Sequence, residues 1–297
     1  MKSVSSPKIL NIVLAIAILL LFVLVVWTGD KGKPLAKEKL ISDALNTPME
    51  LTYNKLGFVS YIINEQVIVE VKDQDYYIKQ QAETIRFFCR LFDYQYDDII
   101  SDLKSKETED EVFEATNIGY LKDKAGNINT YPNFEYGLIE YFYNLNNSNS
   151  KLRKVKYVPY TGDAKYVENL IIYFSSIYPN VDAKALLSIG AAESGYYKVK
   201  YMLKYNNVYG GMSSKGLIKH NNIEQGVLSF VRLMSKNYYG KGLTTFEAIG
   251  RVYCPVNDNG VKKASAHWLS LVKNAKNKYD SYPSTITFNE LIKKEAI

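Results

Sequence analysis

The chain has 297 residues, of which 47% are hydrophobic, and a formal net charge of +6. Its basic residues are dispersed, so the charge does not indicate nucleic-acid binding but suits an anionic setting such as wall polymer or lipid headgroups. The two histidines and the two cysteines, Cys89 and Cys254, have no metal-type spacing, which argues against a structural zinc site. The thiols fit either an extracellular disulfide or two buried free cysteines. The 26 tyrosines fit either genome composition or a carbohydrate-binding surface.

The segment from Ile9 to Trp27 is predicted to anchor the chain in a membrane. It carries no charge, and at about 1.5 Å per residue it reaches roughly 28 Å, close to the hydrocarbon thickness of a bilayer. A cleaved signal peptide is the alternative, but its apolar core is usually about 7–15 residues long. We expect a tail over residues 1–8, a transmembrane helix over 9–27 and a lysine-rich tether over 28–45. Lysines flank the segment on both sides, so charge alone does not set its orientation.

Residues 46–155 are predicted to form a small α+β region of their own. Alternating valines indicate strand structure between residues 58 and 71, and apolar residues at helical spacing indicate a helix over 75–92. Three further elements are expected here, namely a short helix over 97–103, a turn over 126–132 and a helix over 134–145.

Residues 156–282 are predicted to be a mainly α-helical domain. Apolar periodicity predicts helices over 166–178, 183–193, 223–238, 246–253 and 262–279. Asp182 and Asn222 are the expected N-caps of the second and third, and Thr244 with Glu247 has capping-box spacing before the fourth. The last helix is expected to bury Leu271. A C-terminal tail is expected over 283–297.

Glu193 is the strongest candidate for a chemical role. It ends an apolar, small-residue helix in the run Leu-Ser-Ile-Gly-Ala-Ala-Glu-Ser-Gly-Tyr-Tyr over 187–197. Apolar neighbours and the negative end of the helix dipole both disfavour its ionised form, and Gly195 lets the chain turn so that the carboxyl faces a cleft. A glutamic acid that keeps its proton near neutral pH suits general-acid cleavage of a glycosidic bond. The alternative is a solvent-facing glutamate, with Ser194 either supporting it or simply ending the helix.

Further motifs follow Glu193 in a fixed order. They are Asn-Asn-Val-Tyr-Gly-Gly-Met over 206–212, Tyr-Cys-Pro over 253–255 and a tryptophan at 268. Together with Glu-Ser-Gly over 193–195, this order resembles the bacterial glucosaminidase family, the endo-β-N-acetylglucosaminidase-like peptidoglycan hydrolases of the lysozyme-like superfamily. The resemblance covers residues 165–280. It implies a lysozyme-like helical catalytic domain over 156–282 that cleaves the glycan strand and needs no metal or organic cofactor.

The resemblance also implies roles for individual residues. Glu193 would protonate the leaving glycosidic oxygen, and Tyr253 would lie across the cleft and hydrogen-bond near the reacting sugar. The cleft wall that touches the N-acetylated sugar would comprise Asn207, Tyr209, Gly210 and Gly211. The alternatives are an ordinary Asn/Gly-rich turn for the wall and a buried ring bonded to the backbone for Tyr253. Trp268 is expected to pack behind the site as a core residue.

A second catalytic carboxylate is missing from its expected place. Glycosidases usually pair two acids about 5–9.5 Å apart, and in this family the second can come from the hairpin after the turn. Here that hairpin, 212–220, contains no acid, and Glu224 and Glu247 have plainer roles near helix N-termini. Two mechanisms need no second acid: attack by the substrate's 2-acetamido oxygen, or attack by the muramic acid 6-hydroxyl, as in lytic transglycosylases. The missing acid also leaves open a non-catalytic wall-binding scaffold.

The expected substrate fixes the expected location. Peptidoglycan lies outside the cell, so the anchor is predicted to run N-in and C-out, as a single-pass span that holds the catalytic domain against the cell wall. The expected partners are peptidoglycan glycan strands and the membrane, with no nucleic acid, and the sequence identifies no partner protein. A cytoplasmic, membrane-attached helical adaptor is the alternative that the flanking lysines permit.

Overall fold

The computed structural model describes residues 50–53, 58–63, 66–72, 78, 81–105, 116–148 and 156–295. The chain divides into two compact units, one of residues 1–52 and 60–70 and the other of residues 53–59 and 71–297. The predicted tail, membrane anchor and tether, residues 1–45, lie outside the described residues. Within the described part of the chain, no helix is both long and apolar enough to cross a membrane.

A three-stranded sheet holds the described residues of the first unit. Its strands are β1 (Glu50–Tyr53), β2 (Phe58–Ile63) and β3 (Gln66–Lys72), in the order β1-β2-β3. The strand structure predicted between residues 58 and 71 is therefore confirmed as two neighbouring strands.

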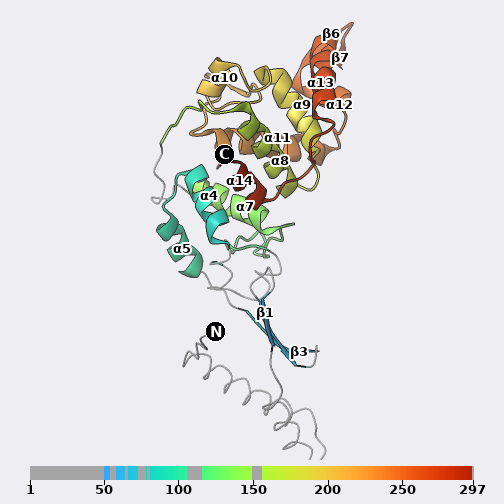
Figure 1. Ribbon diagram of the computed structural model, residues 1–297. Coiled ribbons are helices and arrows are strands. Elements are labelled where there is room, and N and C mark those ends of the chain that lie inside the picture. Colours follow the sequence, from blue (N-terminus) through green and yellow to red (C-terminus); the bar gives the residue numbers. More distant parts are fainter. Residues whose placement is uncertain are drawn as a thin grey trace, which may run out of the picture. The chain divides into compact units, whose positions relative to one another are not determined.

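The second unit is mainly helical, as predicted (Figure 1). Its helices are α4 (Ala82–Phe92), α5 (Tyr96–Ser105), α7 (Phe134–Asn147), α8 (Ala164–Ile177), α9 (Ala183–Ser194), α10 (Lys200–Lys204), α11 (Ile223–Asn237), the 3₁₀ helix η1 (Tyr239–Lys241), α12 (Phe246–Tyr253), α13 (Ala266–Tyr279) and α14 (Phe288–Glu295). Two antiparallel hairpins complete it: β4 (Met212–Ser213) with β5 (Gly216–Leu217), and β6 (Pro255–Asp258) with β7 (Val261–Ala264).

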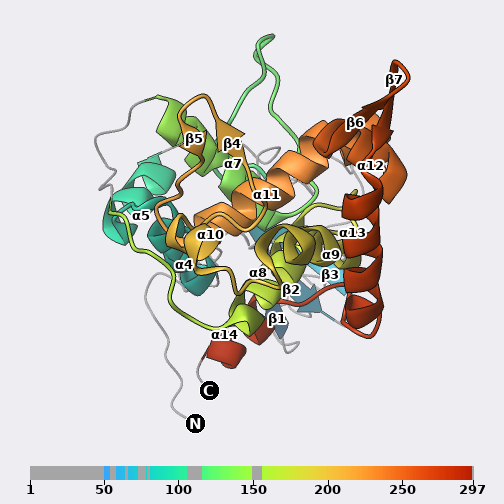
Figure 2. The same ribbon diagram turned by 90° about the horizontal axis from the view of Figure 1, so that it is seen from above.

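Helix α8 lies at the centre of this unit because it is apolar on almost every side. Every residue from Val167 to Ser175 is buried, and the helix packs against α9, α11 and α14. Helix α9 in turn packs closely against α13 (Figure 2). This pairing matters for the site because it brings the last turn of α9 next to the first turn of α13.

The helices of the predicted N-terminal region belong to the same core. The Phe87 ring of α4 lies 6.3 Å from the Phe174 ring of α8, and Asn222 at the start of α11 donates a 3.0 Å hydrogen bond to the Leu91 carbonyl. Arg232 of α11 pairs with Glu140 of α7 at 3.1 Å. The predicted boundary at residue 155 is therefore not a boundary in the fold, because these apolar faces are covered by helices that come much later in the sequence.

Most helix bounds and caps agree with the sequence. Asp182 accepts hydrogen bonds from two amides of α9, and Asn222 accepts one from Gln225. Two details were wrong. The N-cap of α12 is Thr245, whose side chain accepts from Ala248, and not Thr244. Leu271 is 41% exposed, because α13 buries a face made of Trp268, Val272, Ala275 and Tyr279 and Leu271 lies outside it. The helix begins at Ala266, after a hairpin that the sequence pattern did not indicate.

The predicted C-terminal tail is largely structured. Helix α14 packs against α8, Leu291 is fully buried, and the Phe288 ring lies 5.5 Å from that of Phe87. Both cysteines are free: Cys89 is buried in α4, and Cys254 is half-buried at the end of α12. Of the two thiol states compatible with the sequence, the structure has the unpaired one.

Candidate active site

Glu193 occupies the last turn of α9, where the chain reverses sharply. Gly195 has φ 57°, and it is followed by two tyrosines that also have positive φ, 58° at Tyr196 and 61° at Tyr197. Such a conformation disfavours residues with a Cβ. It is held by Tyr197, which is buried and donates a 2.7 Å hydrogen bond to the Leu187 carbonyl.

Ser194 ends the helix and does not support its neighbour. Its hydroxyl donates to the Gly190 carbonyl at 2.6 Å and accepts from the Tyr197 amide at 3.0 Å. Gly190 is required here because a Cβ would lie 2.8 Å from the Tyr197 hydroxyl oxygen. This buried cluster fixes the end of α9 and therefore the position from which Glu193 extends.

The Glu193 carboxyl is half-buried and makes one hydrogen bond to a side chain. The indole Nε1 of Trp268 donates to Oε1 at 2.8 Å. Burial raises the pKa of the carboxyl above its ordinary value, and the Trp268 hydrogen bond lowers it, with a net rise. Because Oε1 accepts from an N–H group, the proton of the neutral acid belongs on Oε2.

Gly210 faces that second oxygen. A Cβ at this position would lie 2.8 Å from Glu193 Oε2, and the backbone has φ +68°, a conformation that favours glycine. Gly210, which was expected in the wall that touches the sugar, therefore lies against the Glu193 carboxyl. Glycine makes room for Oε2 because it places no side chain against this oxygen.

The asparagines before this glycine shape the loop. Asn207 is fully buried; its Nδ2 donates to the Gly211 and Ile218 carbonyls at 2.9 Å each, and its Oδ1 accepts from the Tyr209 and Gly211 amides. Asn206 bonds in the same way to the neighbouring segments. The Asn207 side chain, expected to touch substrate, is thus used inside the protein, where it holds the loop in place.

Tyr209 also points inward. Its ring is 4% exposed and stacks on Phe230 at 5.3 Å, and its hydroxyl lies 3.3 Å from Ser229 Oγ. Gly211 packs against this ring, since a Cβ would lie 2.4 Å from Tyr209 Cε2. The part of Tyr209 that reaches the site is its carbonyl.

Tyr253 closes the arrangement by donating a hydrogen bond from its hydroxyl to the Tyr209 carbonyl. Its ring lies 5.7 Å from that of Trp268. Burial, and then the nearby charge of Glu193, raise the pKa of Tyr253 well above its usual value, so the phenol stays neutral. One of the two interpretations of Tyr253 was a ring bonded to the backbone, and the structure has this bond. The bond joins the loop of residues 206–212 to the helix pair α12 and α13.

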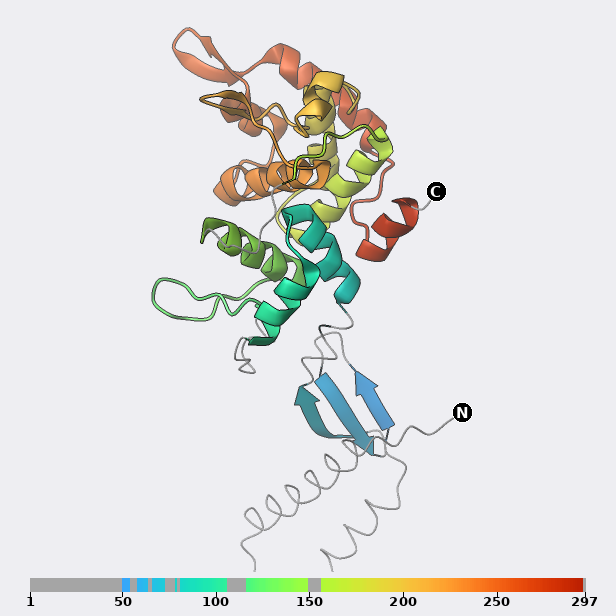
Figure 3. The same cartoon turned by 90° about the vertical axis from the view of Figure 1, so that its left-hand side faces the viewer.

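Two hairpins follow in sequence from segments that contact Glu193 or its neighbours. β4–β5 follows directly after Gly211, and β6–β7 connects Tyr253 to Trp268. Figures 2 and 3 show both hairpins projecting from the same side of the helical unit. Both hairpins carry exposed apolar side chains: Met212 at the base of β4–β5 is 67% exposed, and Val261 near the tip of β6–β7 is 57% exposed.

The two other acids considered from the sequence, both in the described part of the chain, bond to other partners. Glu224 accepts a 2.8 Å hydrogen bond from Tyr166 in the first turn of α11, and Glu247 pairs with Lys273 at 2.6 Å in the first turn of α12. Among the described residues, no group of three or more histidines, cysteines or acids is arranged to hold a metal ion. Glu193 thus offers a carboxyl whose burial favours the neutral form, among aromatic rings and backbone groups.

Sequence reasoning singled out Glu193 and placed Trp268 in the core behind it. Trp268 is indeed a core residue, 5% exposed, but the sequence did not predict that its indole bonds the Glu193 carboxyl. The signal was the position of this tryptophan in the first turn of the closing helix, which turns its ring toward the end of α9. Comparison of the chain with protein-family models, curated proteins and solved structures finds no match.

Proposed function

We propose that this protein cleaves the glycan strand of peptidoglycan, in the manner of an endo-β-N-acetylglucosaminidase, from a helical domain with a lysozyme-like arrangement. The observation that carries the proposal is the environment of Glu193. Burial raises its pKa, Trp268 occupies Oε1, and Oε2 lies against the bare backbone of Gly210. A carboxylic acid that is protonated on one defined oxygen is what general-acid cleavage of a glycosidic bond requires.

In the proposed step, Glu193 Oε2–H gives its proton to the leaving glycosidic oxygen as the bond from that oxygen to C1 breaks. The nucleophile comes from the substrate or from water, because the hairpin 212–220 carries no acid. Attack by the 2-acetamido oxygen forms a cyclic intermediate that water opens to a reducing end. The Tyr209 carbonyl, held by Tyr253, and the backbone of Gly210 are the polar groups nearest to the reacting sugar in this scheme.

A lytic transglycosylase is the second candidate, and the same missing acid favours it. In that reaction the muramic acid 6-hydroxyl attacks C1 and leaves a 1,6-anhydro end. A non-catalytic wall-binding scaffold is the candidate from another class. Such a scaffold would bind glycan with the aromatic side chains near Glu193 and would not use the carboxyl as an acid.

The membrane anchor from Ile9 to Trp27 belongs to the proposal as well. A C-out orientation would confine glycan cleavage to wall within reach of the membrane. The proposed localisation is thus the cell membrane, with the helical unit on the outer side.

The test is the Glu193→Gln variant of the full-length chain, assayed on purified wall. Loss of a general acid lowers the rate by about 10²- to 10⁴-fold. The fold should persist, because glutamine removes a half-buried acid whose ionised form the site disfavours, and thermal melting checks this. Glu247→Gln is the matched control and should clear wall normally. Undiminished clearing by Glu193→Gln would overturn the proposal.

Mass spectrometry of the digested wall then separates the candidates. Reducing ends identify the hydrolase, and 1,6-anhydro ends identify the transglycosylase. Binding to wall without release of fragments identifies the scaffold.

A further inference from the structure

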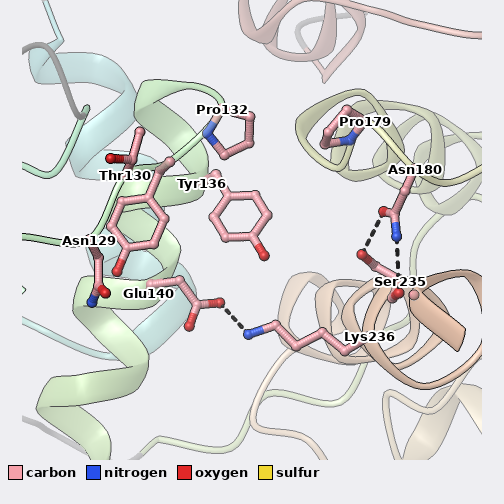
Figure 4. A pocket seen from close by; sticks show the side chains of 11 residues that line it. Asn129, Thr130, Pro132, Tyr136, Glu140, Pro179, Asn180, Ser235 and Lys236 are labelled. Atoms are coloured by element: carbon pink, nitrogen blue, oxygen red, sulfur yellow. Dashed lines mark hydrogen bonds and ion pairs between the residues drawn. The ribbon is translucent and has the colours of Figure 1, made fainter. Parts of the chain in front are cut away.

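A hollow of about 610 Å³ lies between α7, the turn from α8 to α9, and the C-terminal end of α11 (Figure 4). Its volume is within the range of about 300–1,000 Å³ that is typical of small-molecule sites. None of the residues that line it belongs to the Glu193 site. It is therefore a separate feature of the helical unit.

One wall of the hollow is aromatic. The Tyr131 and Tyr136 rings stack with centroids 5.7 Å apart and planes inclined by 22°. Tyr136 is supported from behind by the buried Tyr178 ring at 4.9 Å, and Figure 4 shows its hydroxyl directed into the space between α7 and α11. Pro132 and Pro179 flank the hollow from its two sides.

The floor carries a carboxylate that stays ionised. Glu140 accepts from Arg232 at 3.1 Å and from Lys236 at 2.8 Å. Burial raises the pKa of Glu140, but the hydrogen bonds and charges of these two cations outweigh burial and hold the pKa below its ordinary value. The acid thus supplies acceptor oxygens, and its charge is already compensated.

The wall opposite the tyrosines carries an amide and a hydroxyl. Ser235 Oγ donates to Asn180 Oδ1 at 2.8 Å, and Asn180 Nδ2 donates to the Ser235 carbonyl at 3.1 Å. One of the two amide hydrogens of Asn180 is thus used, and the other is free to meet a ligand. Ser235 itself is buried, so the amide is held in a fixed orientation.

We propose that this hollow binds a sugar ring of the same glycan strand that Glu193 cleaves. Flat apolar surfaces joined to both donors and acceptors match a sugar, which has apolar faces and hydroxyl edges. The identity of the glycan rests on the proposed function, whereas the saccharide class rests on the hollow alone.

Helix α9 relates the hollow to the candidate active site. Asn180, which lines the hollow, precedes the first turn of this helix, and Glu193 lies in its last turn. Their separation of 13 residues corresponds to about 20 Å of helix. A strand of several linked sugars would be needed to occupy both places.

The test uses the full-length chain carrying Glu193→Gln, so that the ligand is not cut, and the N-acetylglucosamine hexasaccharide as the probe in calorimetry. Adding Tyr131→Ala should lower the affinity about tenfold through loss of the stacking surface. Tyr96→Ala is the matched control. This tyrosine of α5 is also half-buried and contacts the Arg86 guanidinium, and its loss should leave the affinity unchanged.

Asn180→Ala is the second variant and should weaken binding without touching the aromatic pair. Thermal melting of each variant shows whether it folds. Unchanged affinity in a folded Tyr131→Ala or Asn180→Ala chain would overturn the proposal, and so would a failure of the hexasaccharide to bind at all. Undiminished wall clearing by Glu193→Gln bears only on the proposed function. Hexasaccharide binding that depends on Tyr131 would still support a saccharide site in the hollow.

Discussion

Trp268 Nε1 donates a 2.8 Å hydrogen bond to Glu193 Oε1, and this bond joins the first turn of α13 to the last turn of α9. It fixes the plane of the carboxyl and leaves Oε2 as the oxygen on which the neutral form of the acid places its proton. The bond also works against burial, because it favours the charged form that burial disfavours. The Trp268 bond therefore orients the Glu193 carboxyl and also makes the rise in its pKa smaller than burial alone would give.

Replacing the indole with a ring that has no donor should separate these two effects. In Trp268→Phe the pKa of Glu193 should rise further, because only burial then acts on it. Activity that needs the protonated acid falls as pH rises through this pKa, so the basic limb of the pH–rate profile should move to higher pH. The maximal rate should fall about tenfold or more, because a hydrogen bond to a charged group is lost. An unmoved basic limb would contradict the assigned role.

Gly210 provides a steric test of the same carboxyl. In Gly210→Ala the new Cβ would lie 2.8 Å from Glu193 Oε2, and a displaced acid can cost about 10²-fold in rate. The positive φ adds a stability loss of about 1–2 kcal/mol. Gly242→Ala is the control, since its φ is +77° and a Cβ there meets nothing within 4 Å. Gly242→Ala should lose about as much stability from its positive φ as Gly210→Ala does, but it should clear wall normally. Thermal melting and wall digestion measure the two effects.

The local parts of this fold could be predicted from sequence. Asp182 and Asn222 act on amides two or three residues away, so short-range patterns suffice to find them. The packing of Phe87 against Phe174 and Phe288 could not be found in this way, because it depends on which apolar faces meet across the chain. The predicted domain boundary and the predicted tail were wrong for this reason.

In the candidate site, too, short-range features could be predicted and contacts between distant segments could not. Glu193 and Gly195 form one local helix end, and their pattern pointed to the acid directly. The Trp268 bond spans 75 residues and depends on the rotation of α13 about its axis. Asn207 shows the opposite error, because an Asn/Gly-rich motif does not reveal whether its amide faces a ligand or the loop itself.

Glu168 is predicted to be a major support of the α8–α13 contact. Its carboxylate is 3% exposed and accepts 3.0 Å hydrogen bonds from Lys278, Tyr279 and Tyr282. Burial raises the pKa of Glu168, but these bonds outweigh it and lower the pKa below the ordinary value of 4.5. Glu168→Gln should lower the free energy of unfolding by about 2–3 kcal/mol at pH 7, measured by chemical denaturation.

The direction of the Glu168 pKa shift predicts how the stability difference between the parent and Glu168→Gln changes with pH. A depressed pKa stabilises the fold above the unfolded pKa, and the contribution is lost as pH falls through the folded pKa. The difference between the parent and Glu168→Gln should therefore shrink below about pH 4.5. Glu247→Gln, which breaks an exposed pair with Lys273, is the control and should cost less than about 1 kcal/mol. A constant difference from pH 7 to pH 3 would contradict the assignment.

The cysteines can test the proposed orientation in the membrane. Cys89 is 2% exposed, and burial raises the pKa of its thiol to about 12, so it carries almost no reactive thiolate at neutral pH. Cys254 is half-buried at the end of α12 and is the thiol expected to react. A membrane-impermeant maleimide applied to intact cells should label the chain, and Cys254→Ser should abolish this labelling while Cys89→Ser leaves it intact. Labelling that appears only after the cells are permeabilised would place the helical unit in the cytoplasm and remove peptidoglycan as its substrate.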